Sequence, residues 1–332
     1  MDLDWLDPHQ LDPRDVAGAL AVLEVARAAD TPVLVPILAT SYTYRLQHGW
    51  DGDPPLTAVH RDTRGRIDGV LDVWLPRWDN LHLGIVGVTV DPLSRGKGLG
   101  RAMFEAGVER ARADNRTTIL SQTYDYPTGV GFLTAMGFSQ AAEEILRRQD
   151  PADLDWDRLD VLYAEAERKA AAYELIRVAG LTPDDQLEAV TVMTAAINDA
   201  PIEGLDLEDD VFTPERVRNF ETGQLARGRR IYRLMARHRD TGELAGNTMV
   251  GVEGERPWQS FQFDTSVVRA HRGHRLGLLL KIDMLRWLAA EEPQLRSVDT
   301  GNAGSNSYMI AINDAIGYRV VGSMLEYQLK LS

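Results

Sequence analysis

Two glycine-rich, basic segments follow strand-like runs and have the composition of an anion-binding loop. Residues 88–100 read VTVDPLSRGKGLG, and residues 265–277 read TSVVRAHRGHRLG. Glycine lets the backbone approach a ligand closely, and the free N–H groups and dipole at the start of a helix favour an anion. Each segment therefore predicts a phosphate-binding cradle at a strand-to-helix junction.

The first segment lacks the signatures of two familiar phosphate motifs. Gly100 is followed by Arg101 and Ala102 rather than by Lys-Ser or Lys-Thr, so nucleotide hydrolysis of the P-loop type loses its main support. No third glycine follows Gly98 and Gly100 at the spacing that a dinucleotide fingerprint requires. What remains is Arg-x-x-Gly-x-Gly directly after a Val-x-Val strand.

This pattern resembles the pyrophosphate-binding signature of the GNAT superfamily of N-acetyltransferases, Gln/Arg-x-x-Gly-x-Gly/Ala. Arg95, Gly98 and Gly100 match it fully, whereas in the second segment Arg275 stands at the middle glycine position. The resemblance implies acetyl-CoA as co-substrate. The residues implied to bind it are Val88, Val90, Arg95, Gly96, Gly98, Gly100 and Arg101 in the first segment, and Val267, Val268, Arg272, Gly273, His274 and Gly277 in the second.

Residues 302–318 resemble the family helix that carries an Asn-x-x-Ala/Met motif and ends in Gly-Phe. The resemblance implies that Asn302 and Asn306 line the CoA arm. Many family members place a tyrosine four residues before that glycine, as general acid to the departing thiolate. Leu133 and Asn313 stand at the two corresponding positions, so neither half has the usual acid, and Asn313 becomes a candidate catalytic residue.

The resemblance also implies direct attack of an acceptor amine on the thioester within a ternary complex. Such a site needs an oxyanion donor and a proton acceptor. We expect backbone N–H groups near Val90 and Val267 to be the donors. Asp264 is the candidate base, because it alternates with its neighbours on the strand entering the second cradle and can face away from the core. A solvated or hydrogen-bonded strand aspartate is the alternative.

An acidic stretch at residues 206–210, preceded by residues 198–201, lies where the first helices of the family border the acceptor site. It could attract a cationic amine, and an acidic surface loop is the alternative interpretation. No His, Asp or Glu cluster in the sequence has the spacing of metal ligands, so no metal is expected.

The two cradles belong to an internal duplication. His60-Arg61-Asp62-Thr63 recurs at residues 238–241, and Met136-Gly137-Phe138 recurs as Ile316-Gly317-Tyr318, at nearly the same offset as the cradles. We therefore expect two domains, residues 1–155 and 173–332, joined by a charged, alanine-rich linker helix within residues 156–172. This organisation is similar to that of tandem-domain actinobacterial acetyltransferases of the mycothiol synthase-like kind.

Hydrophobic periodicity predicts the same element order in each half. The expected elements are helices at 15–29 and 184–198, strands at 56–62, 67–75, 81–90, 117–122, 173–178, 231–239, 243–252 and 260–268, and a helix after each cradle. The fold class is therefore α+β, with two tandem GNAT-like domains, each a mixed, mostly antiparallel sheet flanked by helices.

Composition limits the possible partners and location. The chain has 332 residues, no cysteine and a formal net charge of −14, which disfavours nucleic acid as partner and excludes disulfides and a cysteine nucleophile. Neither a signal core nor an 18-residue apolar run occurs, so we expect a soluble cytoplasmic protein without membrane contact. The oligomeric state is left open.

These observations lead us to expect an acetyl-CoA-dependent N-acetyltransferase acting on a small-molecule amine. A non-catalytic acyl-CoA-binding or sensor protein, and a protein with one catalytic and one structural domain, are the alternatives. The first half has the better cradle, but only the second combines Asn306, Asp264 and the acidic approach. We therefore expect catalysis in the second half.

Overall fold

The computed structural model describes residues 2–331, which divide into two compact units. The unit that we call the first lobe contains the chain up to Glu144, Ile202–Asp209 and the residues from Ser323 onward. The second lobe contains Ile145–Pro201 and Asp210–Gly322. The chain therefore does not divide once near residue 155, as the sequence suggested, because each lobe includes a segment from the opposite part of the sequence.

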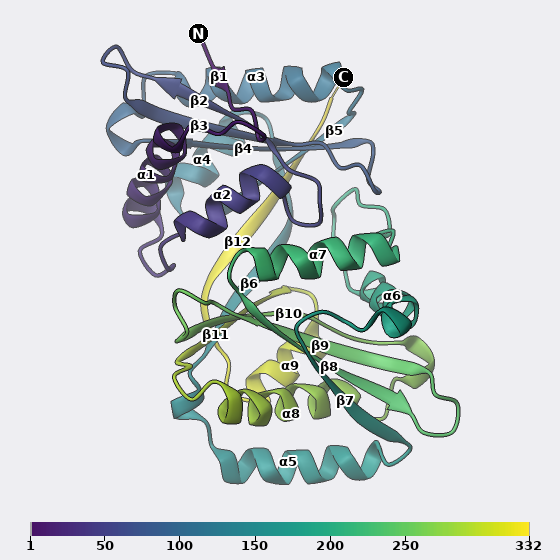
Figure 1. The fold of residues 1–332 in the computed structure, drawn as a ribbon. Coiled ribbons are helices and arrows are strands. Elements are labelled where there is room, and N and C mark those ends of the chain that lie inside the picture. The colour runs from purple at the N-terminus through teal and green to yellow at the C-terminus, as the bar shows by residue number, and fades with distance from the viewer. Residues whose placement is uncertain (1, 332) are drawn as a thin grey trace. The chain divides into compact units, whose positions relative to one another are not determined.

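The first lobe is a mixed sheet in which β12 lies beside β5, and β6 begins in this lobe (Figure 1). The pair of β4 and β5 is parallel, whereas β1 with β2, β2 with β3, β3 with β4, and β5 with β12 are antiparallel. The strands are β1 (Asp4–Trp5), β2 (Leu56–Arg61), β3 (Ile67–Trp74), β4 (Leu83–Val90), β5 (Thr118–Tyr124), β6 (Ser139–Gln149) and β12 (Arg319–Lys330), and the helices are α1 (Pro13–Asp30), α2 (Ala39–His48), α3 (Leu99–Ala113) and α4 (Pro127–Ala135).

The second lobe repeats this plan, with β6 as the strand beside β11 and with β10 and β11 as the parallel pair. Its strands are β7 (Tyr173–Ala179), β8 (Arg230–His238), β9 (Leu244–Val252), β10 (Gln259–Val267) and β11 (Ser297–Ala303), and its helices are α5 (Trp156–Lys169), α6 (Leu187–Thr194), α7 (Pro214–Ala226), α8 (Leu276–Glu291) and α9 (Ser307–Ala315). The expected fold class, a mixed and mostly antiparallel sheet flanked by helices, is confirmed.

Alternate strand residues bury opposite faces of each sheet, as the two-residue period of a strand requires. In the first lobe Leu71 packs with α3 and α4, whereas its neighbour Val70 packs with α1 and α2. In the second lobe Leu234 packs with α8, whereas its neighbour Met235 packs with α6 and α7. Both sheets are therefore covered by helices on both faces.

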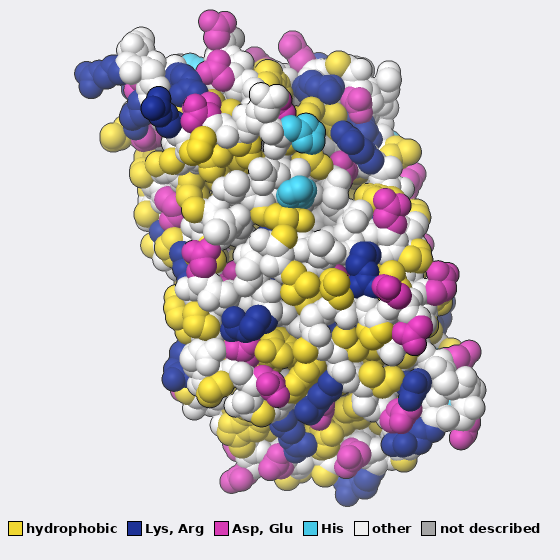
Figure 2. Space-filling model, viewed as in Figure 1, with side chains coloured by type: hydrophobic (Ala, Val, Ile, Leu, Met, Phe, Trp, Pro, Cys, Tyr) yellow, Lys and Arg dark blue, Asp and Glu magenta, His cyan; other side chains and the backbone are white. Residues whose placement is uncertain are grey.

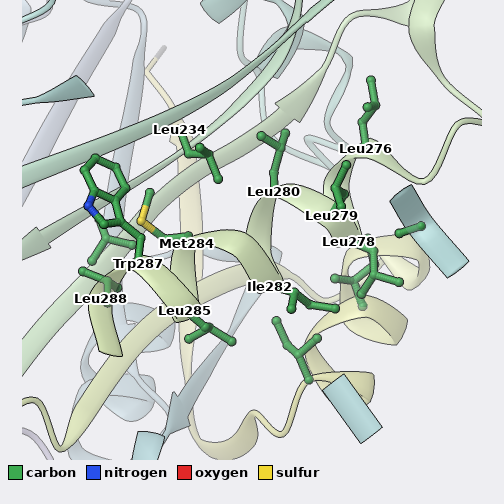
Figure 3. Packing of buried hydrophobic residues seen from close by; sticks show 14 of the residues in the cluster. Leu234, Leu276, Leu278, Leu279, Leu280, Ile282, Met284, Leu285, Trp287 and Leu288 are labelled. Carbon is green, nitrogen blue, oxygen red and sulfur yellow. The ribbon is translucent and has the colours of Figure 1, made fainter. Parts of the chain in front are cut away.

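Helix α8 is buried nearly all round, which is unusual for a helix that covers a sheet. Figure 3 shows its leucine, isoleucine, methionine and tryptophan side chains packed toward the strands and toward neighbouring helices. Its other side is covered by α5, which packs along it through Leu159 and Ala166 (Figure 1). The segment expected to be a linker helix is therefore part of the core of the second lobe.

The parallel strands of each lobe separate partway along their length. β4 and β5 pair only over Leu83–Ile85 and Thr118–Leu120, although both strands continue. β10 and β11 pair only from Gln259 to Phe261 on the β10 side. In each lobe the first strand of the pair, β4 or β10, then runs into the cradle. The opening between the strands therefore lies beside the cradle in both lobes.

Within residues 2–331 no helix is both long and apolar enough to cross a membrane.

Candidate functional site

The first cradle presents open backbone at the start of α3. Gly96 and Gly98 have φ angles of 75° and 86°, a left-handed conformation that glycine adopts without strain, and a Cβ at either position would meet no atom within 4 Å. Gly98 is the N-cap of α3, and no side chain in the described chain caps this helix. The cradle therefore offers uncapped helix N–H groups to an anion, as the motif predicts.

Arg95 is engaged inside the first lobe. Its two terminal nitrogens donate to the carboxylate of Asp30 at 2.8 and 2.6 Å, and its Nε donates to the carbonyl of Val90 at 3.0 Å. The guanidinium thereby ties the end of α1 to the end of β4. In the structure Arg95 shapes the cradle, whereas Lys97 and Arg101 are the exposed cations beside it.

The second cradle repeats this arrangement. Arg272 donates from Nε to the carbonyl of Val267 at 3.1 Å and from Nη2 to Asp199 at 2.7 Å. Asp199 ends the short helix η4 (Ala195–Asp199), just as Asp30 ends α1. The two motif arginines thus perform the same scaffolding role in both lobes, which supports the internal duplication.

Two basic side chains of the second cradle contact α5, one of them at its C-terminal end. Arg275, the N-cap of α8, has a left-handed φ of 58° and donates to Glu165 at 2.8 Å. Nδ1 of His274 lies 3.3 Å from the carbonyl oxygen of Lys169. A Cβ on Gly277 would lie 3.4 Å from Ile312. Residues 272–275 remain exposed, and a Cβ on Gly273 would meet no atom within 4 Å, so the second cradle differs from the first mainly by Arg275 and its ion pair.

Strand β10 of the second lobe has a β-bulge at a place where β4, its counterpart in the first lobe, has none. The pairing of β10 with β9 shifts between Gln262 and Thr265, whereas β4 pairs with β3 in continuous register. As a result two residues, Phe263 and Asp264, occupy the place where β4 has only Gly87. A bulge leaves backbone groups outside the ladder and re-aims side chains. The bulge lies where β10 leaves β11.

The expected oxyanion donors keep a suitable orientation. The N–H of Val268 donates to the carbonyl of Ala245 and the N–H of Asp91 donates to the carbonyl of Asp68, each at 2.9 Å. Because successive N–H groups of an antiparallel strand point to opposite edges, those of Val267 and Val90 face the strand from which β10 or β4 has separated. Donors near Val90 and Val267 therefore stay a prediction.

Asp264 is exposed to solvent, although protein atoms surround it densely. The expected alternation with Phe263 and Thr265 is broken by the bulge. Loss of hydration raises the pKa of Asp264, the Asp210 carboxylate raises it further, and the Arg233 guanidinium opposes both. An accessible carboxylate with a raised pKa is a suitable proton acceptor.

A buried polar network lies on the α7 side of this strand. Arg233 donates to Glu221 and to Asn247, each at 3.1 Å, and Asn247 donates to Ser266 at 3.1 Å. The network crosses β8, β9 and β10 and ends two residues from Asp264. Sequence reasoning missed it, although Arg233, the charged residue in the middle of the run IYRLMA, was a visible signal.

The three asparagines singled out by the resemblance form part of the frame of α9. Asn306 is the N-cap, accepting from the N–H of Met309 at 3.1 Å. Asn313 is fully buried and donates to Asn302 at 2.7 Å. Because its side chain has no access to solvent, Asn313 anchors α9 to β11, and this placement does not fit a proton donor to a departing thiolate.

The acidic stretch 206–210 is divided between the lobes. Asp206 belongs to the first lobe, where it binds Lys330 and accepts from Thr118 at 3.1 Å. Asp210 belongs to the second lobe, where Asn198 binds its backbone at 3.0 and 3.1 Å. On the face shown in Figure 2, acidic and basic side chains are interspersed. Asp210 is therefore the member of the stretch that acts on Asp264.

Comparison with known proteins agrees with this geometry. Residues 25–138 match the family model of the acetyltransferase (GNAT) family. A tandem GNAT protein from the clavulanic acid biosynthesis pathway, solved without acetyl-CoA, is 27% identical with a TM-score of 0.80, over 99% of this chain and 98% of that one. A GCN5-related N-acetyltransferase from Sphaerobacter thermophilus is 15% identical with a TM-score of 0.69, over 99% and 95% of the two chains. No curated protein matches the sequence.

Proposed function

We propose that this chain, which has the tandem GNAT organisation, is an acetyl-CoA-dependent N-acetyltransferase that acetylates the amine of a small molecule. The GNAT fold supports acyl-CoA-dependent acetyl transfer in general. The observation that carries the finer proposal is the bulge of β10, which sets the accessible Asp264 at the point where β10 leaves β11 and beside a phosphate cradle.

The residues of the second lobe supply the two functions that amide formation requires. Bound acetyl-CoA supplies the thioester, and the acceptor amine forms the C–N bond as the C–S bond breaks. Asp264 takes the proton that the amine loses, and its raised pKa makes it a stronger base than an ordinary aspartate. Backbone N–H groups near Val267, where β10 has separated from β11, stabilise the negative charge on the carbonyl oxygen.

The first lobe has an open cradle without this machinery. Gly87 stands at the position of the bulge, so the lobe has no carboxylate there, and Leu133 occupies the position of the family tyrosine. We assign turnover, with a weaker acetyl-CoA site, to the second lobe, and a tighter acetyl-CoA site without turnover to the first. This division corresponds to the arrangement of one catalytic and one non-catalytic domain.

Release of CoA tests the proposal. Purified protein is mixed with acetyl-CoA and a panel of amines, and free thiol is measured over time. We expect amine-dependent release that is lost in Asp264→Asn. Acetyl-CoA binding without release for any amine would instead identify the chain as an acyl-CoA-binding protein.

A further inference from the structure

The opening of the second lobe is bordered by phenylalanine rings on the α7 side of the sheet. Phe261 and Phe263 lie on β10 with ring centroids 5.4 Å apart, and Phe220 on α7 meets Phe263 edge-on, also at 5.4 Å. Phe261 is 38% exposed, although it stands at the last position where β10 pairs with β11. A large aromatic surface thus remains uncovered where the strands begin to separate.

The same place carries negative charge. Asp264 adjoins Phe263 in the bulge and is exposed, and the carboxylate of Asp210 acts on it. Two guanidinium groups lie nearby, Arg233 and Arg229, the second 5.9 Å from the centre of the Phe263 ring. Each is paired with a glutamate, Arg233 with Glu221 and Arg229 with Glu253. Asp264 is therefore the exposed charge beside the rings, and its field favours a cation and repels an anion.

We propose that the acceptor of the second lobe is a small primary amine attached to an apolar ring and without a carboxylate. The inference rests on the proposed function. The ring covers the exposed face of Phe261, as aromatic pairs favour, and the amine reaches Asp264. An α-amino acid is disfavoured because its carboxylate would face Asp264. A linear polyamine is disfavoured because it leaves the phenylalanine surface uncovered.

Three amines separate these possibilities at saturating acetyl-CoA. 2-Phenylethylamine has the ring and the amine, phenylalanine adds a carboxylate, and putrescine lacks the ring. We expect kcat/KM for 2-phenylethylamine to exceed those of the other two by at least roughly 10-fold, the scale on which apolar contacts discriminate. Phe261→Ser should lower kcat/KM for 2-phenylethylamine more than kcat/KM for putrescine, and so narrow the advantage of the ring-bearing amine.

Trp5→Ser is the matched control, since it removes an exposed aromatic side chain from the first lobe and should change none of the three values. If putrescine or phenylalanine reacts as well as 2-phenylethylamine, or if Phe261→Ser keeps the preference, the acceptor class is wrong while the acetyltransferase stands. If no amine of a wider panel releases CoA, the proposed function itself fails and the inference fails with it.

Discussion

Asp264 is the residue on which the proposed chemistry depends. Removing a positioned general base commonly lowers the rate by about 100-fold to 10,000-fold. Asp264→Asn keeps the shape of the side chain and removes its proton affinity, so turnover should fall on that scale while acetyl-CoA affinity stays nearly unchanged. Steady-state kinetics and calorimetry measure the two quantities. Full turnover in this variant would show that the carboxylate is only a solvated strand residue.

Lys281 is a second unusual residue, and its effect is on stability. It is 2% exposed, donates to Gln262 at 2.6 Å, and burial lowers its pKa from 10.5 to about 7. Because the unfolded chain binds the proton more tightly, stability is lowered by about 5 kcal/mol below pH 7. This penalty shrinks as the pH rises from 7 toward 10.5.

Lys281→Met should therefore raise the melting temperature at pH 7, and its advantage over the natural protein should narrow as the pH rises. Thermal unfolding between pH 6 and 9.5 measures both curves. Lys169→Met, which changes an exposed lysine, supplies the background. A difference that stays constant with pH would mean that packing, rather than the buried amine, sets the effect.

At the scale of elements, the pair of Arg95 and Asp30 holds the first cradle in place. Because Arg95 is bound to Asp30 and Val90, we expect it to act on the ligand through the position of the loop. Asp30→Asn should then weaken acetyl-CoA binding in the first lobe in the same direction as Arg95→Ala. Calorimetry on both variants makes the comparison. Normal affinity in Asp30→Asn beside a large loss in Arg95→Ala would assign the guanidinium to the phosphate directly.

The sequence predicted those elements that local patterns determine. β3, β4 and β8 follow the expected ranges closely, because alternating or continuous apolar residues mark them. The bulge in β10 was not predicted, since its extra residue is visible only against the pairing with β9. The partners of Arg95 and Arg272 were missed for a similar reason, because each carboxylate lies more than 60 residues away in the chain.

Local sequence patterns also could not predict that the lobes exchange segments. β6 and β12 each pass from one lobe into the other, so the strand next to β5 comes from the C-terminal end of the chain. Which strand fills that place depends on tertiary pairing rather than on the residues of the strand. The role of α5 was missed too, because its charged surface suggested a linker while Leu159 and Ala166 bury against α8.

At the scale of the whole molecule, each lobe has a feature that the other lacks. The first has a cradle with glycine at both motif positions and a regular β4, whereas the second has Arg275 at the middle position and the bulge with Asp264. Acetyl-CoA binding and turnover should therefore respond to different substitutions. A protein whose lobes were functionally equal would lose both properties in parallel.

Gly98→Val and Gly277→Val test this division. Valine at Gly98 is strained at φ 86°, and valine at Gly277 adds atoms beyond a Cβ that already lies 3.4 Å from Ile312. We expect calorimetry to show two acetyl-CoA sites in the natural protein, with the tighter one lost in Gly98→Val and the weaker one lost in Gly277→Val. Amine-dependent CoA release should persist in Gly98→Val and disappear in Gly277→Val. If release instead disappears in Gly98→Val while the second site still binds, the first lobe is the catalyst, and the second lobe serves only as its support.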